Sequence, residues 1–133
     1  MLTVTGLRTG YGRIEALRGL TMAVEKGQIA TLIGANGAGK TTLLMSLCGR
    51  PKPWQGQILF QGQDITGWET HRIMRLGIAH SPEGRRVFPR MSVRENLQIG
   101  AVHCAPKHFA ADLDFVYSLF PRLKEREAQR GGT

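Results

Sequence analysis

Cysteine is scarce in this chain, and the few cysteines present form no recognisable site. Cys48 and Cys104, the only two among 133 residues, lie far apart and in no spacing typical of a metal centre or a redox pair. We therefore expect both to be reduced thiols, as in a cytosolic protein. A disulfide framework and a cysteine-based metal site are excluded.

Long apolar runs are also missing. No stretch approaches the length of a membrane-spanning helix, and the first residues, Met-Leu-Thr-Val-Thr, lack the basic and apolar segments of a signal peptide. Internal repeats and low-complexity linkers are absent too. A hydrophobic fraction of 41% suffices for a core, and 17 glycines fit a turn-rich α/β layout. The sequence therefore indicates one α/β domain or part of one.

The net charge of +8 does not come from a concentrated basic patch. The basic residues are scattered, apart from a loose group at residues 85–90 and another at residues 122–130. Glu125 and Glu127 interrupt the second group, which is typical of a solvated helix face. No aromatic ladder or nucleic-acid signature accompanies these residues. We therefore expect no nucleic acid as a partner.

A glycine-rich turn between an apolar strand and an apolar helix is the strongest feature of the chain. Residues 29–33 (Ile-Ala-Thr-Leu-Ile) predict a buried strand, and Leu43, Leu44 and Leu47 predict the apolar face of a helix. The nine residues that join or open these elements are Gly34, Ala35, Asn36, Gly37, Ala38, Gly39, Lys40, Thr41 and Thr42. Their spacing matches the phosphate-binding P-loop, G-x-x-x-x-G-K-[ST].

Each residue type in this P-loop has a chemical reason. Gly34, Gly37 and Gly39 allow backbone angles that a side chain forbids, so that N–H groups can surround an anion at the positive end of the helix. Lys40 is expected to reach the β- and γ-phosphates, and the Thr41 hydroxyl is expected to bind Mg²⁺. All nine residues are thus predicted to bind a nucleoside triphosphate with Mg²⁺.

The other elements follow from periodicity and from capping signals. Strands are predicted at 2–5, 20–24, 56–62 and 77–80, and helices at 112–120, from residue 121, and after the capping boxes at 66–69 and 92–95. Gly49 and Pro51 should end the P-loop helix. The chain changes near residue 84 from strand-rich to helical. We therefore predict a nucleotide-binding core at 1–84 and the start of a helical subdomain at 85–133.

Beyond the P-loop, the chain resembles the ATP-binding subunits of ABC transporters over its whole length. Gly10-Tyr11-Gly12 looks like the A-loop of this family, in which an aromatic ring stacks on adenine; tyrosine offers a flat face with a polar tip. The resemblance implies a P-loop NTPase fold of ABC type. Such a fold would combine an antiparallel β subdomain, the start of a parallel core sheet and a helical subdomain.

Residues 82–97 carry a second resemblance, with one departure from the family pattern. Most ABC ATPases have glutamine where this chain has Glu83, and that residue touches Mg²⁺ and the attacking water. A carboxylate is a competent Mg²⁺ ligand, so Glu83 is predicted to be catalytic together with Lys40, and to bind metal together with Thr41. Pro-Glu-Gly-Arg-Arg at 82–86 looks like the LivF-type ATPases of branched-chain amino acid importers. Residues 64–66, 73–75 and 119–123 add to this likeness.

This resemblance implies a function and a set of partners. The expected function is binding of ATP and Mg²⁺ to energise import of branched-chain amino acids. Expected partners are permease subunits, contacted after Glu83 with Phe88 as an apolar contact, and a second ATPase subunit in a head-to-tail dimer. The expected place is cytoplasmic, peripheral on the inner face of the cell membrane. Because related urea importers share much of this pattern, an importer of urea, another amide or another amino acid is the alternative.

Several family features are not found in the sequence. No Leu-Ser-Gly-Gly signature and no apolar strand ending in Asp-Glu occur, and residues 130–133 stop where the signature would begin. The four histidines precede that point, so none can be the switch histidine; they are His71, His80, His103 and His108. We therefore expect the N-terminal half of an ABC ATPase, inactive alone, or a nucleotide-binding fragment without turnover.

Two other classes fit less well. A small-molecule P-loop kinase needs an arginine-rich lid, which Arg85 and Arg86 could imitate, but Tyr11 ahead of the P-loop argues against it. A soluble ABC protein of translation or DNA repair would carry paired cassettes or long coiled-coil insertions. Neither feature appears in the sequence.

Overall fold

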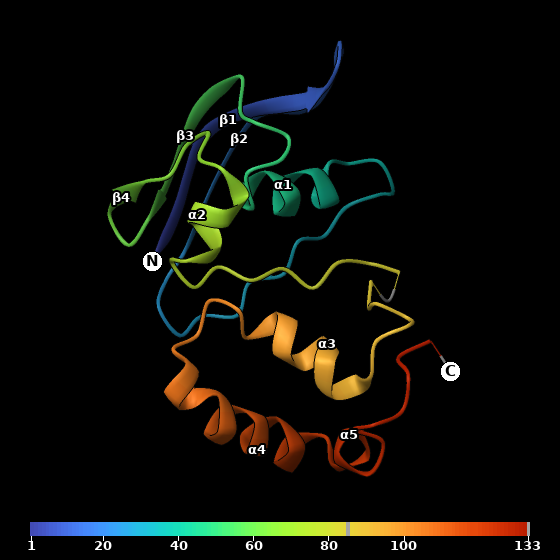
Figure 1. Ribbon diagram of the computed structural model, residues 1–133. Helices are drawn as coiled ribbons and strands as arrows, with labels where there is room; N and C mark the ends of the chain where they lie inside the picture. The colour runs from blue at the N-terminus through green and yellow to red at the C-terminus, as the bar shows by residue number, and fades with distance from the viewer. Residues whose placement is uncertain (85, 133) are drawn as a thin grey trace. The chain divides into compact units, whose positions relative to one another are not determined.

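The computed structural model describes residues 1–84 and 86–132, so Arg85 of the Pro-Glu-Gly-Arg-Arg segment and Thr133 lie outside the described residues. The chain forms two compact units, Met1–His80 and Ser81–Thr133 (Figure 1). Each unit is described by itself below. The functional division at residue 84 remains a prediction.

The first unit is built on a four-stranded antiparallel sheet with the order β2-β1-β3-β4. Its strands are β1 (Leu2–Tyr11), β2 (Ile14–Val24), β3 (Gln55–Phe60) and β4 (Gln63–Asp64). Strands β1 and β2 form a hairpin in which Leu2 pairs with Val24 and Tyr11 with Ile14. This confirms the strands expected at 2–5, 20–24 and 56–62, and it extends the first two toward one another. The expected antiparallel β subdomain is present.

Two helices pack on the apolar face of this sheet. They are α1 (Lys40–Leu47) and α2 (Thr70–Met74) (Figure 1). Each contributes one side chain to the buried core, Leu43 from α1 and Ile73 from α2. The other core residues are Val4, Leu7, Leu17, Ile58, Phe60 and Ile65. Leu44 was predicted on the same face but is 42% exposed, because one residue turns an α-helix by about 100°. Gly49 follows the C-cap residue of α1, as expected.

Two predicted strands do not form. Residues 29–33 and 77–80 have no strand conformation, and Ile29 and Ile33 are 94% and 93% exposed rather than buried. A strand requires a neighbour that pairs with its N–H and C=O groups. Among residues 1–84 and 86–132, no strand lies beside either segment in the sheet. The sequence pattern thus identified residues that favour a strand. Neither segment has a partner strand among the described residues, so neither forms a strand.

The capping box predicted at residues 66–69 is also wrong. The Thr66 hydroxyl accepts a hydrogen bond from the N–H of Ile58 in β3 at 2.8 Å, and the Thr66 N–H donates to Asp64 Oδ1 at 2.9 Å. The hydroxyl is thus engaged by the sheet instead of capping a helix. Helix α2 begins later, with Glu69 at its N-cap and no side-chain cap.

The second unit is helical in its described residues. It contains α3 (Val93–Gly100), a short 3-10 turn η1 (Pro106–His108), α4 (Phe109–Leu119) and α5 (Pro121–Glu125). Helix α4 buries Leu113 and Tyr117, one turn apart on the same face. This confirms the predicted helices at 112–120 and from residue 121. No helix in the described ranges is long and apolar enough to cross a membrane.

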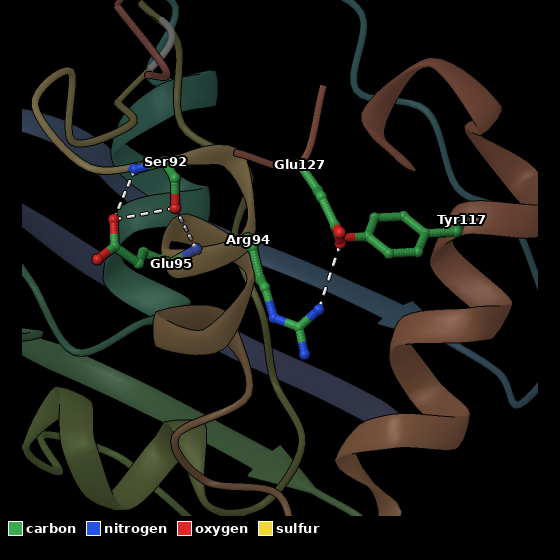
Figure 2. Close-up of polar contacts among 5 residues, drawn as sticks. All are labelled: Ser92, Arg94, Glu95, Tyr117 and Glu127. Carbon is green, nitrogen blue, oxygen red and sulfur yellow. Dashed lines mark hydrogen bonds and ion pairs between the residues drawn. The ribbon is translucent and has the colours of Figure 1, made fainter. Parts of the chain in front are cut away.

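Polar contacts hold the start of α3, as Figure 2 shows. The Ser92 hydroxyl accepts from the N–H of Glu95, while the Ser92 N–H donates to Glu95 Oε2 at 2.7 Å, so the predicted capping box is confirmed. The hydrogen bond from the Ser92 N–H lowers the pKa of the Glu95 carboxyl below its ordinary value. Nearby, Glu127 Oε2 accepts from the Tyr117 hydroxyl and pairs with Arg94 at 3.2 Å.

A backbone ladder joins the two ends of this unit. The N–H of Val93 donates to Gln129 O, and the N–H of Gly131 donates to Met91 O at 2.8 Å. Ser92 and Arg130 form an isolated antiparallel bridge between these bonds. The segment after α5 is thus held along the loop that precedes α3.

Replacement of the N-cap residue should destabilise α3 locally. Ser92→Ala removes the hydroxyl that accepts from Glu95, which costs about 1 kcal/mol in comparable helices. We expect the α3 backbone N–H groups to exchange with deuterium about fivefold faster. Ser118→Ala is the matched control, because Ser118 is exposed and its hydroxyl donates to the Phe115 carbonyl within α4. Equal exchange rates in α3 for Ser92→Ala and the unmodified chain would contradict the capping role.

Candidate nucleotide-binding site

The P-loop joins residues 29–33, which are not part of a strand, to helix α1. Gly39 is the N-cap residue with φ +89°, and Gly37 has φ +84°, so both occupy the left-handed region that favours glycine. Gly34 does not share this conformation. A Cβ at Gly39 would lie 2.8 Å from the carbonyl oxygen of Ala16 and 2.8 Å from Leu17 Cδ2, both in β2. Gly39 therefore permits close contact between the loop and the sheet.

The Lys40 ammonium group closes over this loop. Its Nζ donates to the carbonyl oxygens of Gly34 at 2.6 Å and Ala35 at 2.7 Å. No carboxylate within residues 1–84 or 86–132 pairs with it. Its positive charge is therefore uncompensated and lies at the N-terminal end of α1, whose first turn has no acidic residue. A charge of this sign at a helix N-terminus suits an anion such as a phosphate group.

The two threonines after Lys40 have different environments. Thr41 is exposed, and Thr42 is 7% exposed and belongs to the buried side of α1. An exposed hydroxyl on the first turn of the helix is a suitable oxygen ligand for Mg²⁺ next to a bound phosphate. The donor set of the P-loop thus fits a nucleotide with Mg²⁺. Across residues 1–84 and 86–132, no three His, Cys, Asp or Glu side chains cluster as a self-sufficient metal site.

An open cavity of about 700 Å³ lies between the P-loop and β2. Its lining residues are Ile14, Glu15, Ala16, Leu17, Arg18, Gly19, Leu20, Thr21, Gly37 and Ala38. This volume is in the range of small-ligand sites, about 300–1,000 Å³. The Arg8 guanidinium hydrogen-bonds Glu15 at 2.6 Å and holds the pKa of that carboxyl below its ordinary value. At the cavity wall, the charge of Glu15 is therefore balanced by Arg8, and the neighbouring Arg18 is exposed.

Tyr11 and Glu83 are placed differently from the P-loop residues. Tyr11 ends β1, is 52% exposed, and pairs in register with Ile14, which lines the cavity; Tyr11 itself is not part of the lining. Its exposed ring is available to stack on a base. Glu83 is exposed and belongs to the second compact unit, whereas the P-loop belongs to the first. The roles of Tyr11 and Glu83 remain predictions.

Sequence reasoning missed the β2 wall of this cavity. Glu15 and Arg18 precede the predicted strand at residues 20–24, so neither was a candidate. Residues 14–20 (Ile-Glu-Ala-Leu-Arg-Gly-Leu) do not alternate strictly between apolar and polar residues, so the sequence did not indicate this part of the strand. No sequence pattern near these residues indicates that the strand contacts the P-loop.

Comparisons with known proteins agree with this geometry. The ABC transporter family model matches residues 17–131. The whole chain is 50% identical to the high-affinity branched-chain amino acid transport ATP-binding protein BraG of Pseudomonas aeruginosa and covers 57% of it. It is 32% identical to a probable branched-chain amino acid transport ATP-binding protein, LivF, of Archaeoglobus fulgidus and covers 56% of it. The chain thus spans little more than half the length of these relatives.

Solved structures share the fold. An ATP-binding subunit of an ABC transporter superposes with a TM-score of 0.83 at 27% identity, covering 97% of this chain and 53% of the other. A nucleotide-free ATP-binding cassette from an ABC transporter gives a TM-score of 0.80 at 26% identity, covering 98% and 57%. These findings confirm the expected P-loop fold of ABC type and the resemblance drawn from the sequence. With the family model matched over residues 17–131, the chain belongs to the ABC transporter family.

Proposed function

We propose that this chain is the ATP-binding part of a subunit that energises import of branched-chain amino acids across the cytoplasmic membrane. The observation that carries the proposal is the P-loop, in which Lys40 lies unpaired by any described carboxylate at the start of α1. The kind of solute follows from the 50% identity to a branched-chain amino acid transport ATP-binding protein. The solute itself would not touch this subunit.

In the proposed site each residue has a defined role. Lys40 replaces its contacts with Gly34 and Ala35 by contacts with the β- and γ-phosphates, and the P-loop N–H groups surround the phosphate oxygens. Thr41 and Glu83 hold Mg²⁺, which neutralises phosphate charge when it is bound. Tyr11 stacks on the adenine. The cavity along β2 accommodates the rest of the nucleotide.

We propose binding without measurable turnover for the chain alone. No Leu-Ser-Gly-Gly signature and no apolar strand ending in Asp-Glu occur in the sequence. Groups that position water or stabilise charge in the transition state each contribute roughly 100- to 1,000-fold to a rate. With Lys40 and Glu83 as the catalytic residues present, the chain orients ATP but lacks the partner groups for its cleavage.

The second unit offers a surface for the permease. A groove of about 500 Å³ lies between the loop before α3, helix α3 itself and Leu123 of α5. Its apolar lining residues are Val87, Phe88, Val93, Leu97, Ile99 and Leu123. Phe88 is 54% exposed, which suits an apolar contact with a cytoplasmic helix of a permease subunit. This contact would place the chain at the inner face of the membrane, beside a second ATPase subunit in a head-to-tail dimer.

The test of this proposal is ATP binding in the presence of Mg²⁺, measured by calorimetry at fixed ionic strength. Lys40→Ala should weaken binding about 10- to 100-fold, since hydrogen bonds to charged groups contribute about 1.5–3 kcal/mol. Lys26→Ala is the matched control, because it removes the same charge from an exposed turn of the same unit. Equal affinity of both variants would contradict the role of the P-loop. If the unmodified chain released phosphate from ATP well above the rate of the Lys40→Ala variant, the proposed absence of turnover would be contradicted.

A further inference from the structure

The backbone of Phe88 is held by one side chain of helix α3. The Phe88 N–H donates to Asn96 Oδ1 at 2.8 Å, and Asn96 Nδ2 donates back to the Phe88 carbonyl oxygen at 3.1 Å. An asparagine amide offers a carbonyl acceptor and an NH₂ donor, so this exchange uses both of its functions. Both backbone groups of a single residue are thereby fixed. The side chain of Phe88 therefore starts from a point that Asn96 defines.

The same amide holds the turn that follows Phe88. The N–H of Met91 donates to the Phe88 carbonyl oxygen at 3.1 Å and closes a turn with Pro89 at its second position. Proline suits this position, because its φ is already fixed near the required value. Asn96 Nδ2 also donates to the Ser92 carbonyl oxygen at 2.9 Å and to that of Met91 at 3.4 Å. Three carbonyl groups of the loop before α3 thus converge on one amide.

The segment after α5 packs directly against this amide. The N–H of Gly131 donates to the Met91 carbonyl oxygen at 2.8 Å, one of the oxygens that Asn96 also contacts. A Cβ at Gly131 would lie 3.2 Å from Asn96 Nδ2 and 3.4 Å from the Phe88 carbonyl oxygen. The absence of a side chain therefore lets this segment approach the amide closely. Asn96 and Gly131 both line the groove that also contains Phe88.

We propose that Asn96 is a positioning residue for the permease contact: its amide sets the place of Phe88 in the groove, and residues 129–132 hold that amide in turn. Asn96 does not need to touch the permease, because it acts through the backbone of Phe88. The assignment of Phe88 to a permease rests on the proposed function. The position of Phe88 is measurable without a permease, so failure of one proposal can be distinguished from failure of the other.

Fluorine NMR of the full chain, labelled with fluorinated phenylalanine, measures the position of Phe88. Its signal among those of the five phenylalanines is identified by its loss in Phe88→Leu. Asn96→Leu removes the amide at nearly the same size and should shift the Phe88 signal toward its position in the urea-unfolded chain. The Phe88 N–H should exchange with deuterium about tenfold faster. The N–H groups of α3 should stay as protected as before, because leucine favours a helix more than asparagine does.

Gln98→Leu is the matched control, because it removes an amide from an exposed position of the same helix. It should leave the Phe88 signal unchanged. Two glycine variants test the second part of the proposal. Gly131→Ala should shift the Phe88 signal, because its Cβ would crowd the Asn96 amide. Gly100→Ala should not, because a Cβ at that position would meet no heavy atom within 4 Å.

An unchanged Phe88 signal in Asn96→Leu would overturn the proposal. Weaker protection throughout α3 in that variant would overturn it as well, since Asn96 would then only stabilise the helix. Equal signals in Gly131→Ala and Gly100→Ala would overturn the part assigned to residues 129–132, and this pair tests the amide even if Asn96→Leu does not fold. The expected response of Phe88 in a chain that binds no ATP would support the positioning role and contradict the proposed function.

Discussion

Gly39→Ala is expected to abolish ATP binding and to destabilise the first unit. A residue with a side chain at φ +89° loses about 1–2 kcal/mol from backbone conformation alone. Its Cβ would also lie 2.8 Å from the carbonyl oxygen of Ala16, so the loop or β2 must move. That movement displaces the P-loop from the start of α1. Urea unfolding and ATP calorimetry measure the two effects.

Gly37→Ala provides the control for this substitution. Gly37 has nearly the same conformation, φ +84°, but a Cβ at this position would meet no heavy atom within 4 Å. Gly37→Ala should therefore lose only the stability associated with the backbone angle. Equal losses of unfolding free energy in both variants would show that contact with β2 is unimportant.

Leu43→Ala should produce the largest loss of stability. Leu43 is 1% exposed and belongs to the core cluster that joins α1 to the sheet. Removal of a buried leucine side chain costs about 2–5 kcal/mol, because apolar surface is lost from the core and a cavity remains. We expect this decrease in the free energy of unfolding of the first unit, measured in urea. A small domain has only about 5–15 kcal/mol to lose.

The adjacent residue of the same helix is the natural control. Leu44 is 42% exposed, so Leu44→Ala removes the same atoms from a position that water already reaches. Its cost should be about 1 kcal/mol or less. If Leu44→Ala destabilised the unit as much as Leu43→Ala, the assignment of the buried face of α1 would be wrong.

The two capping boxes illustrate how far local spacing predicts structure. Ser92 and Glu95 have no competing partner that removes them from the helix start, and the predicted box forms in full. Thr66 has the same spacing with Glu69, yet its hydroxyl accepts from Ile58 in a neighbouring strand. A contact across the fold thus outcompeted a local one. The sequence around Thr66 contains no sign of that contact.

Strands were predicted well where a partner strand is present in the described sheet. Strands β1 and β2 pair across a short turn, and alternation predicted part of each of them, residues 2–5 and 20–24. Residues 29–33 have a clearer apolar pattern, but pairing is a property of two segments. Within residues 1–84 and 86–132, the second segment is not there. The apolar character of residues 29–33 therefore predicted that they would be buried, but no other described strand covers them.

The candidate site likewise contains residues that the local sequence predicts and residues that depend on contacts across the fold. The P-loop was predictable because its nine residues are contiguous and its chemistry dictates their types. The wall formed by Glu15 and Arg18 was not predictable, since it depends on the approach of Gly39 to β2. Tyr11 and Glu83 were proposed from resemblance, and their roles remain predictions.

The ladder that joins Met91 to Gly131 and Val93 to Gln129 has a consequence for synthesis on the ribosome. The hairpin of β1 and β2 can close as soon as β2 has left the exit tunnel, because its turn is short and local contacts form fast. The loop before α3 must instead wait until Gly131 has emerged. During those seconds of elongation, Val87 and Phe88, each at least half exposed in the finished unit, remain accessible to chaperones. Ribosome pausing between residues 100 and 130 should therefore prolong chaperone contact with this loop.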